Sequence, residues 1–144
     1  MKSKEIITMT QEDKQLLLKV LCEMLPHGVV VSVQGGEFDS YKYSYQLTAV
    51  SKFGQDILCK VYSPIYTPLG CPSIENIKPY LRPMSSMTEE EKEEERKLWD
   101  IITITRNDLH YIYTDFLLSH HFDYCGLIEK GLALEAPEGM YNIK

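Results

Sequence analysis

Two histidines, an aspartate and a cysteine lie close together near the end of the chain, at His120, His121, Asp123 and Cys125. A thiol beside a histidine base is the minimal arrangement of a nucleophilic cysteine site. Cys125 and His121 therefore define one hypothesis, a small cysteine-dependent enzyme. Such dyads are assembled in space rather than along the sequence, so a cysteine in a turn before Gly126 explains the same residues.

The histidines lack the spacing of a metal site. On one helix, His110 and His121 would be separated by three turns, about 16 Å, which is too far for one ion. His120 and His121 would point about 100° apart. Histidines that interact with the free carbonyls and the dipole at the C-terminal end of a helix account for this pattern. We therefore expect no bound metal.

Cysteine spacing and missing motifs narrow the possible classes further. No two cysteines form a C-x-x-C pair, the usual unit of zinc and redox sites. The N-terminus lacks the apolar core of a secretory signal, and no segment approaches the ~20 apolar residues of a membrane span. We expect a cytoplasmic protein with free, buried thiols. Phosphate-loop, dinucleotide, hydrolase and zincin motifs are missing, so we expect no cofactor. The cysteines are Cys22, Cys59, Cys71 and Cys125.

Negative charge is concentrated in one segment. The chain carries 15 Lys and Arg against 21 Asp and Glu, a net charge of −6, and Glu89 to Lys97 supplies half of it. The pI near 5.2 and the lack of basic residues after Arg106 in the third predicted helix argue against nucleic-acid binding, which needs a basic surface. We interpret the Glu89–Glu95 run as a solvated helix face, with mimicry of a nucleic-acid backbone as the alternative.

Aromatic residues near the start of a strand-like segment offer a binding surface. Tyr41 and Tyr43 share a face with Leu47 and Ala49, because alternate residues of a strand point the same way. Leu47 and Ala49 are small enough to lie under the first helix. Tyr41 and Tyr43 then emerge at the margin of the covered area and, with Phe38 in the preceding loop, form a candidate partner-binding patch.

The first half of the chain predicts a helix and three strands. After a loose segment at residues 1–9, Thr10 is a helix N-cap followed by acidic residues, and Pro26 and Gly28 end that helix. Residues 29–33, 41–50 and 56–63 are strand-like and are separated by turn residues. These three segments predict an antiparallel meander with the helix packed on it.

The second half predicts a connector, two helices and a tail. Residues 64–87 form a proline-rich connector that packs onto the sheet, with one helical turn at 73–78. Thr88 and Glu91 form a capping box that starts a second helix. A third helix has Phe116 and Leu117 on its apolar face and ends near His121. The expected fold is a single α+β domain over residues 1–144, closed by a packed apolar tail.

Two segments of the second half carry a resemblance. The first runs from Ile74 to Glu91 and has KPYLRPMSSMT at residues 78–88 as its core. The second runs from HHFDY at 120–124 to APEGMY at 136–141. Both resemble a group of small uncharacterised proteins of gut Bacteroides-type bacteria and of their phages and mobile elements. This resemblance implies a bacterial or phage-encoded accessory role and no particular activity.

The function that these observations favour is a non-catalytic accessory or adaptor protein that binds another protein through Phe38, Tyr41 and Tyr43. The alternatives are the cysteine-dependent enzyme using Cys125 and His121, and a nucleic-acid-associated protein.

Overall fold

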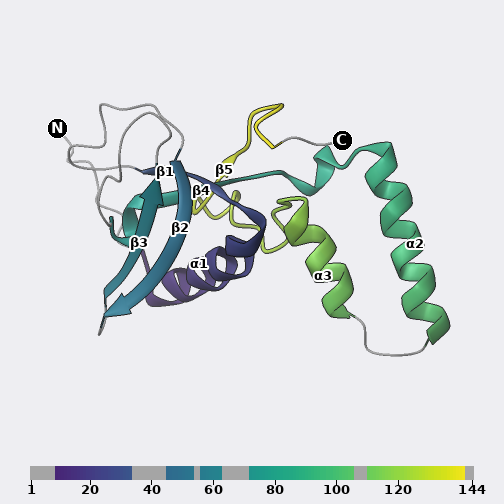
Figure 1. Ribbon diagram of the computed structural model, residues 1–144, viewed down its shortest axis with the longest axis horizontal. Helices are drawn as coiled ribbons and strands as arrows, with labels where there is room; N and C mark the ends of the chain where they lie inside the picture. The colour runs from purple at the N-terminus through teal and green to yellow at the C-terminus, as the bar shows by residue number, and fades with distance from the viewer. Residues whose placement is uncertain (1–8, 34–44, 54–55, 63–71, 106–109, 142–144) are drawn as a thin grey trace.

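The computed structural model describes residues 9–33, 45–53, 56–62, 72–105 and 110–141 (Figure 1). The helices are α1 (Gln11–Met24), α2 (Glu89–Thr105) and α3 (His110–Ser119). The strands are β1 (Val30–Val33), β2 (Tyr45–Phe53), β3 (Asp56–Tyr62), β4 (Ile77–Leu81) and β5 (Leu134–Glu135). Short 3₁₀ turns occupy Leu25–His27, Ile74–Asn76 and Met84–Ser86. The chain therefore has the α+β class that the sequence predicts.

The sheet is larger than the predicted meander. β1, β2 and β3 do form consecutive antiparallel neighbours, but the full strand order is β3-β2-β1-β4-β5. β4 adds to the free edge of β1 in antiparallel orientation, and β5 pairs with β4 in parallel, so the sheet has five strands and is mixed. The prediction of a three-stranded sheet was therefore incomplete.

β4 comes from the segment that was predicted to be a connector. Ile77, Pro79 and Leu81 are buried, whereas Lys78 and Tyr80 are half-buried, which is the alternation of a strand. Prolines normally argue against a strand, so they hid this alternation in the sequence. The predicted helical turn is present just before β4, where the Ser73 hydroxyl caps the turn.

α1 covers one face of the sheet, as predicted (Figure 1). The Thr10 hydroxyl accepts a hydrogen bond from the Asp13 amide at 3.0 Å and caps the helix. The buried side of α1 packs against inward-facing residues of β1, β2 and β3 to form the main core. Its helical members are Leu17, Val20, Leu21 and Met24, and its sheet members include Val31, Tyr45, Leu47, Cys59 and Val61.

A β-bulge changes which side chains of β2 face the main core. Leu47 is opposite Val61, but Ala49 is opposite Lys60, so Thr48 is an extra residue in the ladder. The extra residue reverses the alternation beyond it. Val50, not Ala49, therefore packs against the main core. The prediction that Leu47 and Ala49 share the covered face was correct for Leu47 and wrong for Ala49.

α2 and α3 form an antiparallel pair that lies to one side of the sheet (Figure 1). Phe116 and Leu117 are buried as predicted, but they belong to a second apolar cluster with Met87 and Phe122. Leu118, on another side of α3, belongs to the main core. α3 therefore joins the helical pair to the body of the protein.

The tail after α3 packs on the sheet through backbone hydrogen bonds. The apolar residues of the tail predicted that it would be packed. The Arg82 amide donates to the His121 carbonyl, and the Asp123 amide donates to the Arg82 carbonyl, both at 2.8 Å. The Ala136 amide donates to the Leu81 carbonyl at 2.8 Å.

Within the described residues, no helix combines the length and the apolar character that crossing a bilayer would require.

Replacing Phe116 with Ala tests the second cluster. Because Phe116 is only 5% exposed, we expect the free energy of unfolding to fall by about 3–5 kcal/mol, measured by chemical denaturation. Tyr111→Ala on the same helix is the control, since Tyr111 is 68% exposed and its truncation should change stability by less than about 0.5 kcal/mol. A loss below about 1 kcal/mol for Phe116→Ala would contradict this packing.

Candidate functional site

A buried ion pair joins the end of β4 to the first turn of α2. The Arg82 side chain is 7% exposed and that of Glu91 is 4% exposed. Nη1 of Arg82 donates to Oε2 of Glu91 and Nη2 donates to Oε1, both at 2.7 Å. This two-pronged geometry is the strongest form of an arginine–carboxylate contact.

Glu91 also closes the N-terminus of α2. Its Oε1 accepts a hydrogen bond from the Thr88 amide at 2.9 Å, and its own amide donates to the Thr88 hydroxyl at 3.1 Å. This is the capping box that the sequence predicts. The interpretation of the whole Glu89–Glu95 run as a solvated face was wrong for Glu91, because its carboxylate points into the protein toward Arg82.

His120 is the third member of the cluster. Its Nδ1 donates to Oε2 of Glu91 at 2.7 Å, and its Nε2 lies 3.7 Å from Oε1 of Glu94. The ring packs against both Phe116 and Phe122, with centroid distances of 4.7 and 6.2 Å. His120 was expected to interact with the free carbonyls of its own helix; instead it binds a carboxylate of α2.

Arg82 uses its remaining Nη donors on backbone carbonyls. Nη1 donates to the His120 carbonyl at 3.2 Å, and Nη2 donates to the Ser86 carbonyl at 3.1 Å. The guanidinium lies 4.2 Å from the centre of the Phe122 ring, within the range of a cation–π contact. One side chain thereby holds together β4, α2 and the end of α3.

The environment keeps Glu91 ionised. Burial by itself would raise the pKa of its carboxyl, but the hydrogen bonds from Arg82, the Thr88 amide and His120 outweigh burial and lower that pKa from 4.5 to about 2. The carboxylate is therefore charged at neutral pH and balances the buried guanidinium.

His121 has a different structural role from His120. It adopts a left-handed backbone with φ of 64°, which ends the helix and turns the chain back toward β4. Its Nε2 donates to the Gly28 carbonyl at 2.8 Å, rather than to carbonyls of its own helix. Burial lowers the pKa of the His121 imidazole and favours the neutral ring.

Tyr141 packs flat on His121 and fixes the tail to the sheet. The two rings are 3.7 Å apart and 6° from parallel. The Tyr141 hydroxyl donates to the Tyr80 carbonyl at 2.7 Å and accepts from the Val30 amide at 2.9 Å. Burial raises the pKa of Tyr141 to about 12, so the hydroxyl stays protonated as a donor.

These contacts do not form the hypothetical cysteine dyad. The His121 Nε2 is directed at the Gly28 carbonyl, and the Asp123 carboxylate accepts from the Leu127 and Ile128 amides at 2.7 and 2.9 Å. Cys125 is half-buried against the main core. The base and the carboxylate thus have structural partners, which disfavours a nucleophilic role for Cys125.

Several predicted residues lie outside the described part of the chain. Phe38, Tyr41, Tyr43 and Cys71 are among them, and so is the side chain of His110. Within the described ranges, no three His, Cys, Asp or Glu side chains are grouped so that they could hold a metal ion.

The described thiols differ from the sequence expectation in one case. Cys59 is buried and Cys125 is half-buried, but Cys22 is exposed on α1. The prediction that the cysteines are buried was therefore wrong for Cys22. Cys22 and Cys125 are free thiols.

Three large apolar side chains are exposed in the C-terminal half of α2 and in the first turn of α3. Trp99 and Ile101, near the end of α2, are 37% and 49% exposed, and Tyr111, at the start of α3, is 68% exposed. We call these three residues the hairpin tip. An open groove of about 570 Å³ runs from Tyr111 along α3 to Asp115 and Leu118.

Sequence reasoning missed both the buried ion pair and the hairpin tip. The capping box gave a signal for Glu91, since the glutamate of such a box turns back toward the helix start. The hairpin tip gave no signal in the sequence, because Trp99 and Ile101 could equally be apolar residues that pack α2 against the rest of the protein.

Comparison with known proteins adds no relative. No protein-family model matches the chain, and neither a curated protein nor a solved structure matches it.

Replacing Glu91 with Gln tests the buried pair. The guanidinium of Arg82 would stay buried without a balancing charge, so we expect a loss of about 3–5 kcal/mol in the free energy of unfolding at neutral pH. Because the folded-state pKa of Glu91 is lowered, its stabilisation is complete above pH 4.5 and is lost as the pH falls toward about 2. Denaturation of the wild type across this range should show that loss, and Glu91→Gln should show less of it.

Glu90→Gln is the control, because Glu90 is the exposed neighbour of Glu91 on the same helix. It should change stability by less than about 0.5 kcal/mol. Equal effects of the two substitutions would contradict a structural role specific to Glu91.

Alkylation rates test the hypothesis of a reactive cysteine. With a neutral reagent on the native protein, we expect Cys22 to react first, Cys125 more slowly, and Cys59 only after unfolding, following their exposure. Mass spectrometry of the digested protein would assign each site. Modification of Cys125 ahead of Cys22 would reveal an activated thiolate and would revive the enzyme hypothesis.

Proposed function

We propose that this chain is a non-catalytic accessory protein of the bacterial or phage cytoplasm, and that it binds another protein through the hairpin tip. The observation that carries the proposal is the exposure of Trp99, Ile101 and Tyr111 on a pair of helices that extends beyond the sheet. Tryptophan and tyrosine are enriched at the centres of protein interfaces, where they supply much of the binding energy.

The polar side chains support a binding role rather than catalysis. Arg82, Glu91 and His120 are bonded to one another, while His121 and Asp123 are bonded to backbone groups. Their donors and acceptors therefore serve the fold. A protein that binds a partner through an apolar surface does not need unpaired polar side chains, whereas a catalytic site does.

Charge indicates the kind of partner. The exposed side chains of α2 between residues 89 and 100 include five acidic and three basic groups, a net charge of −2. Arg96 is already paired with Glu93 and Asp100 on the same helix. A partner surface that combines apolar and basic side chains complements this helix, whereas the phosphates of a nucleic acid would be repelled.

The patch of Phe38, Tyr41 and Tyr43 remains a prediction, as a second candidate for the interface in addition to the hairpin tip. It rests on the sequence alone, because its residues lie outside the described part of the chain, and it belongs to a different part of the sequence from the hairpin tip. Variants of the two surfaces therefore distinguish them.

The test compares capture of host proteins by matched variants. Replacing Trp99 and Tyr111 with Ser should make the binding free energy of the captured partner less favourable by about 1 kcal/mol or more, because aromatic residues at an interface contribute at least that much. The thermal midpoint should stay within a few degrees, since both side chains are partly exposed. Raising the salt concentration should weaken capture by the wild type, because the partner is basic.

Met84→Ser is the control, because Met84 is 38% exposed and lies outside the hairpin tip. It should leave capture unchanged. A second arm replaces Tyr41 and Tyr43 with Ser. Loss of capture in that arm alone would move the interface to the tyrosine patch, and undiminished capture in both arms would contradict a protein-binding role for either surface.

A further inference from the structure

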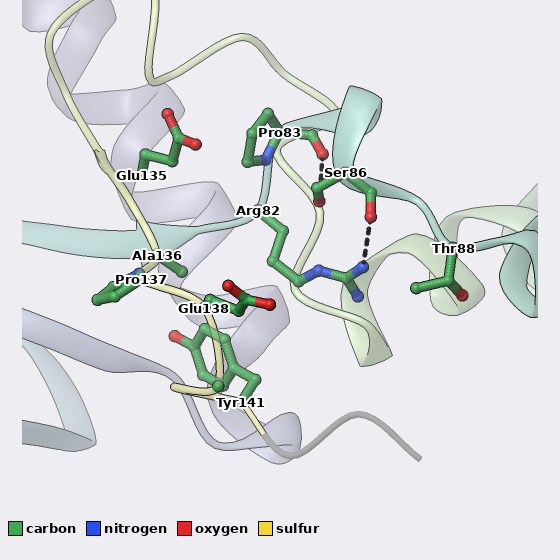
Figure 2. A pocket seen from close by; sticks show the side chains of 10 residues that line it. Arg82, Pro83, Ser86, Thr88, Glu135, Ala136, Pro137, Glu138 and Tyr141 are labelled. Atoms are coloured by element: carbon green, nitrogen blue, oxygen red, sulfur yellow. Dashed lines mark hydrogen bonds between the residues drawn. The ribbon is translucent and has the colours of Figure 1, made fainter.

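A cavity of about 340 Å³ opens beside the buried ion pair, on a different part of the protein from the hairpin tip. One wall comes from the segment between β4 and α2, including Arg82 and Thr88, and the other from the tail at residues 135–141 (Figure 2). The volume falls at the lower end of the range for small-molecule sites, roughly 300–1,000 Å³. The size suits a compact ligand.

Arg82 brings an unused donor to the wall of the cavity. Its four Nη hydrogens are directed at Glu91, His120 and Ser86. Arginine has a fifth donor, the Nε–H. Among the described residues, none accepts a hydrogen bond from it, although Arg82 is only 6% exposed. The Nε atom keeps some contact with solvent, and because Arg82 lines the cavity, an acceptor oxygen bound there can take its hydrogen bond.

The tail supplies groups that recognise a cation. The carboxylates of Glu135 and Glu138 are exposed and line the same cavity, and Figure 2 shows the Glu138 carboxylate in the region between Arg82 and the Tyr141 ring. Tyr141 is held in place by its hydroxyl and by the stacked His121 ring. A fixed tyrosine ring and a carboxylate together favour a positively charged group.

The charge balance restricts the ligand class further. Glu91 already neutralises Arg82, so the two tail glutamates leave the cavity net negative. Phosphate and carboxylate ligands are therefore disfavoured, whereas a neutral carbonyl oxygen can accept from the Arg82 Nε–H. Ala136 and Pro137 add apolar contacts to the wall.

We propose that this cavity binds a primary ammonium group next to a carbonyl oxygen, the chemistry shared by α-amino amides and by the N-terminus of a peptide. The ammonium lies at Glu138 and the Tyr141 ring, and the carbonyl oxygen accepts from the Arg82 Nε–H. This site is independent of the hairpin tip, so either proposal can fail without the other.

Titration calorimetry with four probes tests the site. L-leucinamide carries both groups, N-acetyl-L-leucinamide lacks the ammonium, isoamylamine lacks the carbonyl, and the tripeptide Leu-Gly-Gly presents the same groups at a peptide N-terminus. We expect L-leucinamide to bind, and the two incomplete probes to bind at least about tenfold more weakly. If the tripeptide binds more tightly than L-leucinamide, the natural ligand is a peptide N-terminus. If it binds more weakly, the natural ligand is a free amino amide.

Glu138→Gln should weaken L-leucinamide binding by about tenfold, because the charged partner of the ammonium is removed. Glu138 is exposed, so this variant should keep its fold. The matched control is Glu129→Gln, an exposed glutamate of the tail outside the cavity, which should bind like the wild type. Unchanged affinity in Glu138→Gln, equal binding of the acetylated probe, or no saturation at about 10 mM L-leucinamide would overturn the proposal.

Discussion

The buried pair of Arg82 and Glu91 is the contact on which the arrangement of the second half depends. Two charges inside a protein are stable only when each finds its partner and the remaining donors are satisfied. Here the partners come from three places: the end of β4, the first turn of α2 and the end of α3 at His120. Because all of them must be present together, the pair fixes where the two helices begin and end relative to the sheet.

The other polar residues singled out in the sequence also have structural partners. The histidines and the aspartate that drew attention in the sequence each stabilise a junction: His120 at Glu91, His121 at the Gly28 carbonyl and Asp123 at the turn that follows it. Two surfaces present groups that this network does not use. One is apolar and lies at the hairpin tip, and the other is the negatively charged cavity between Arg82 and the tail. They differ in chemistry and position, so one protein can use both.

Several features could be read from the sequence because they depend on neighbouring residues. The Thr10 cap, the capping box of Thr88 and Glu91, and the periodic burial of Phe116 and Leu117 all arise within one or two helical turns. Other features were misread for lack of long-range information. The prolines concealed β4, and the bulge at Thr48 placed Val50 in the core where strict alternation predicted Ala49.

The sequence by itself determined the α+β class, the starts of α1 and α2, and the order of α1, β1, β2, β3, α2 and α3, since these follow from local caps, turns and periodicity. Only the tertiary structure decided that β4 lies beside β1 and that Glu91 turns inward. Arg82 is nine residues from Glu91, and His120 is 29 residues from it. The burial of a charge depends on whether such distant groups arrive to balance it, and no local pattern of amino acids contains that information.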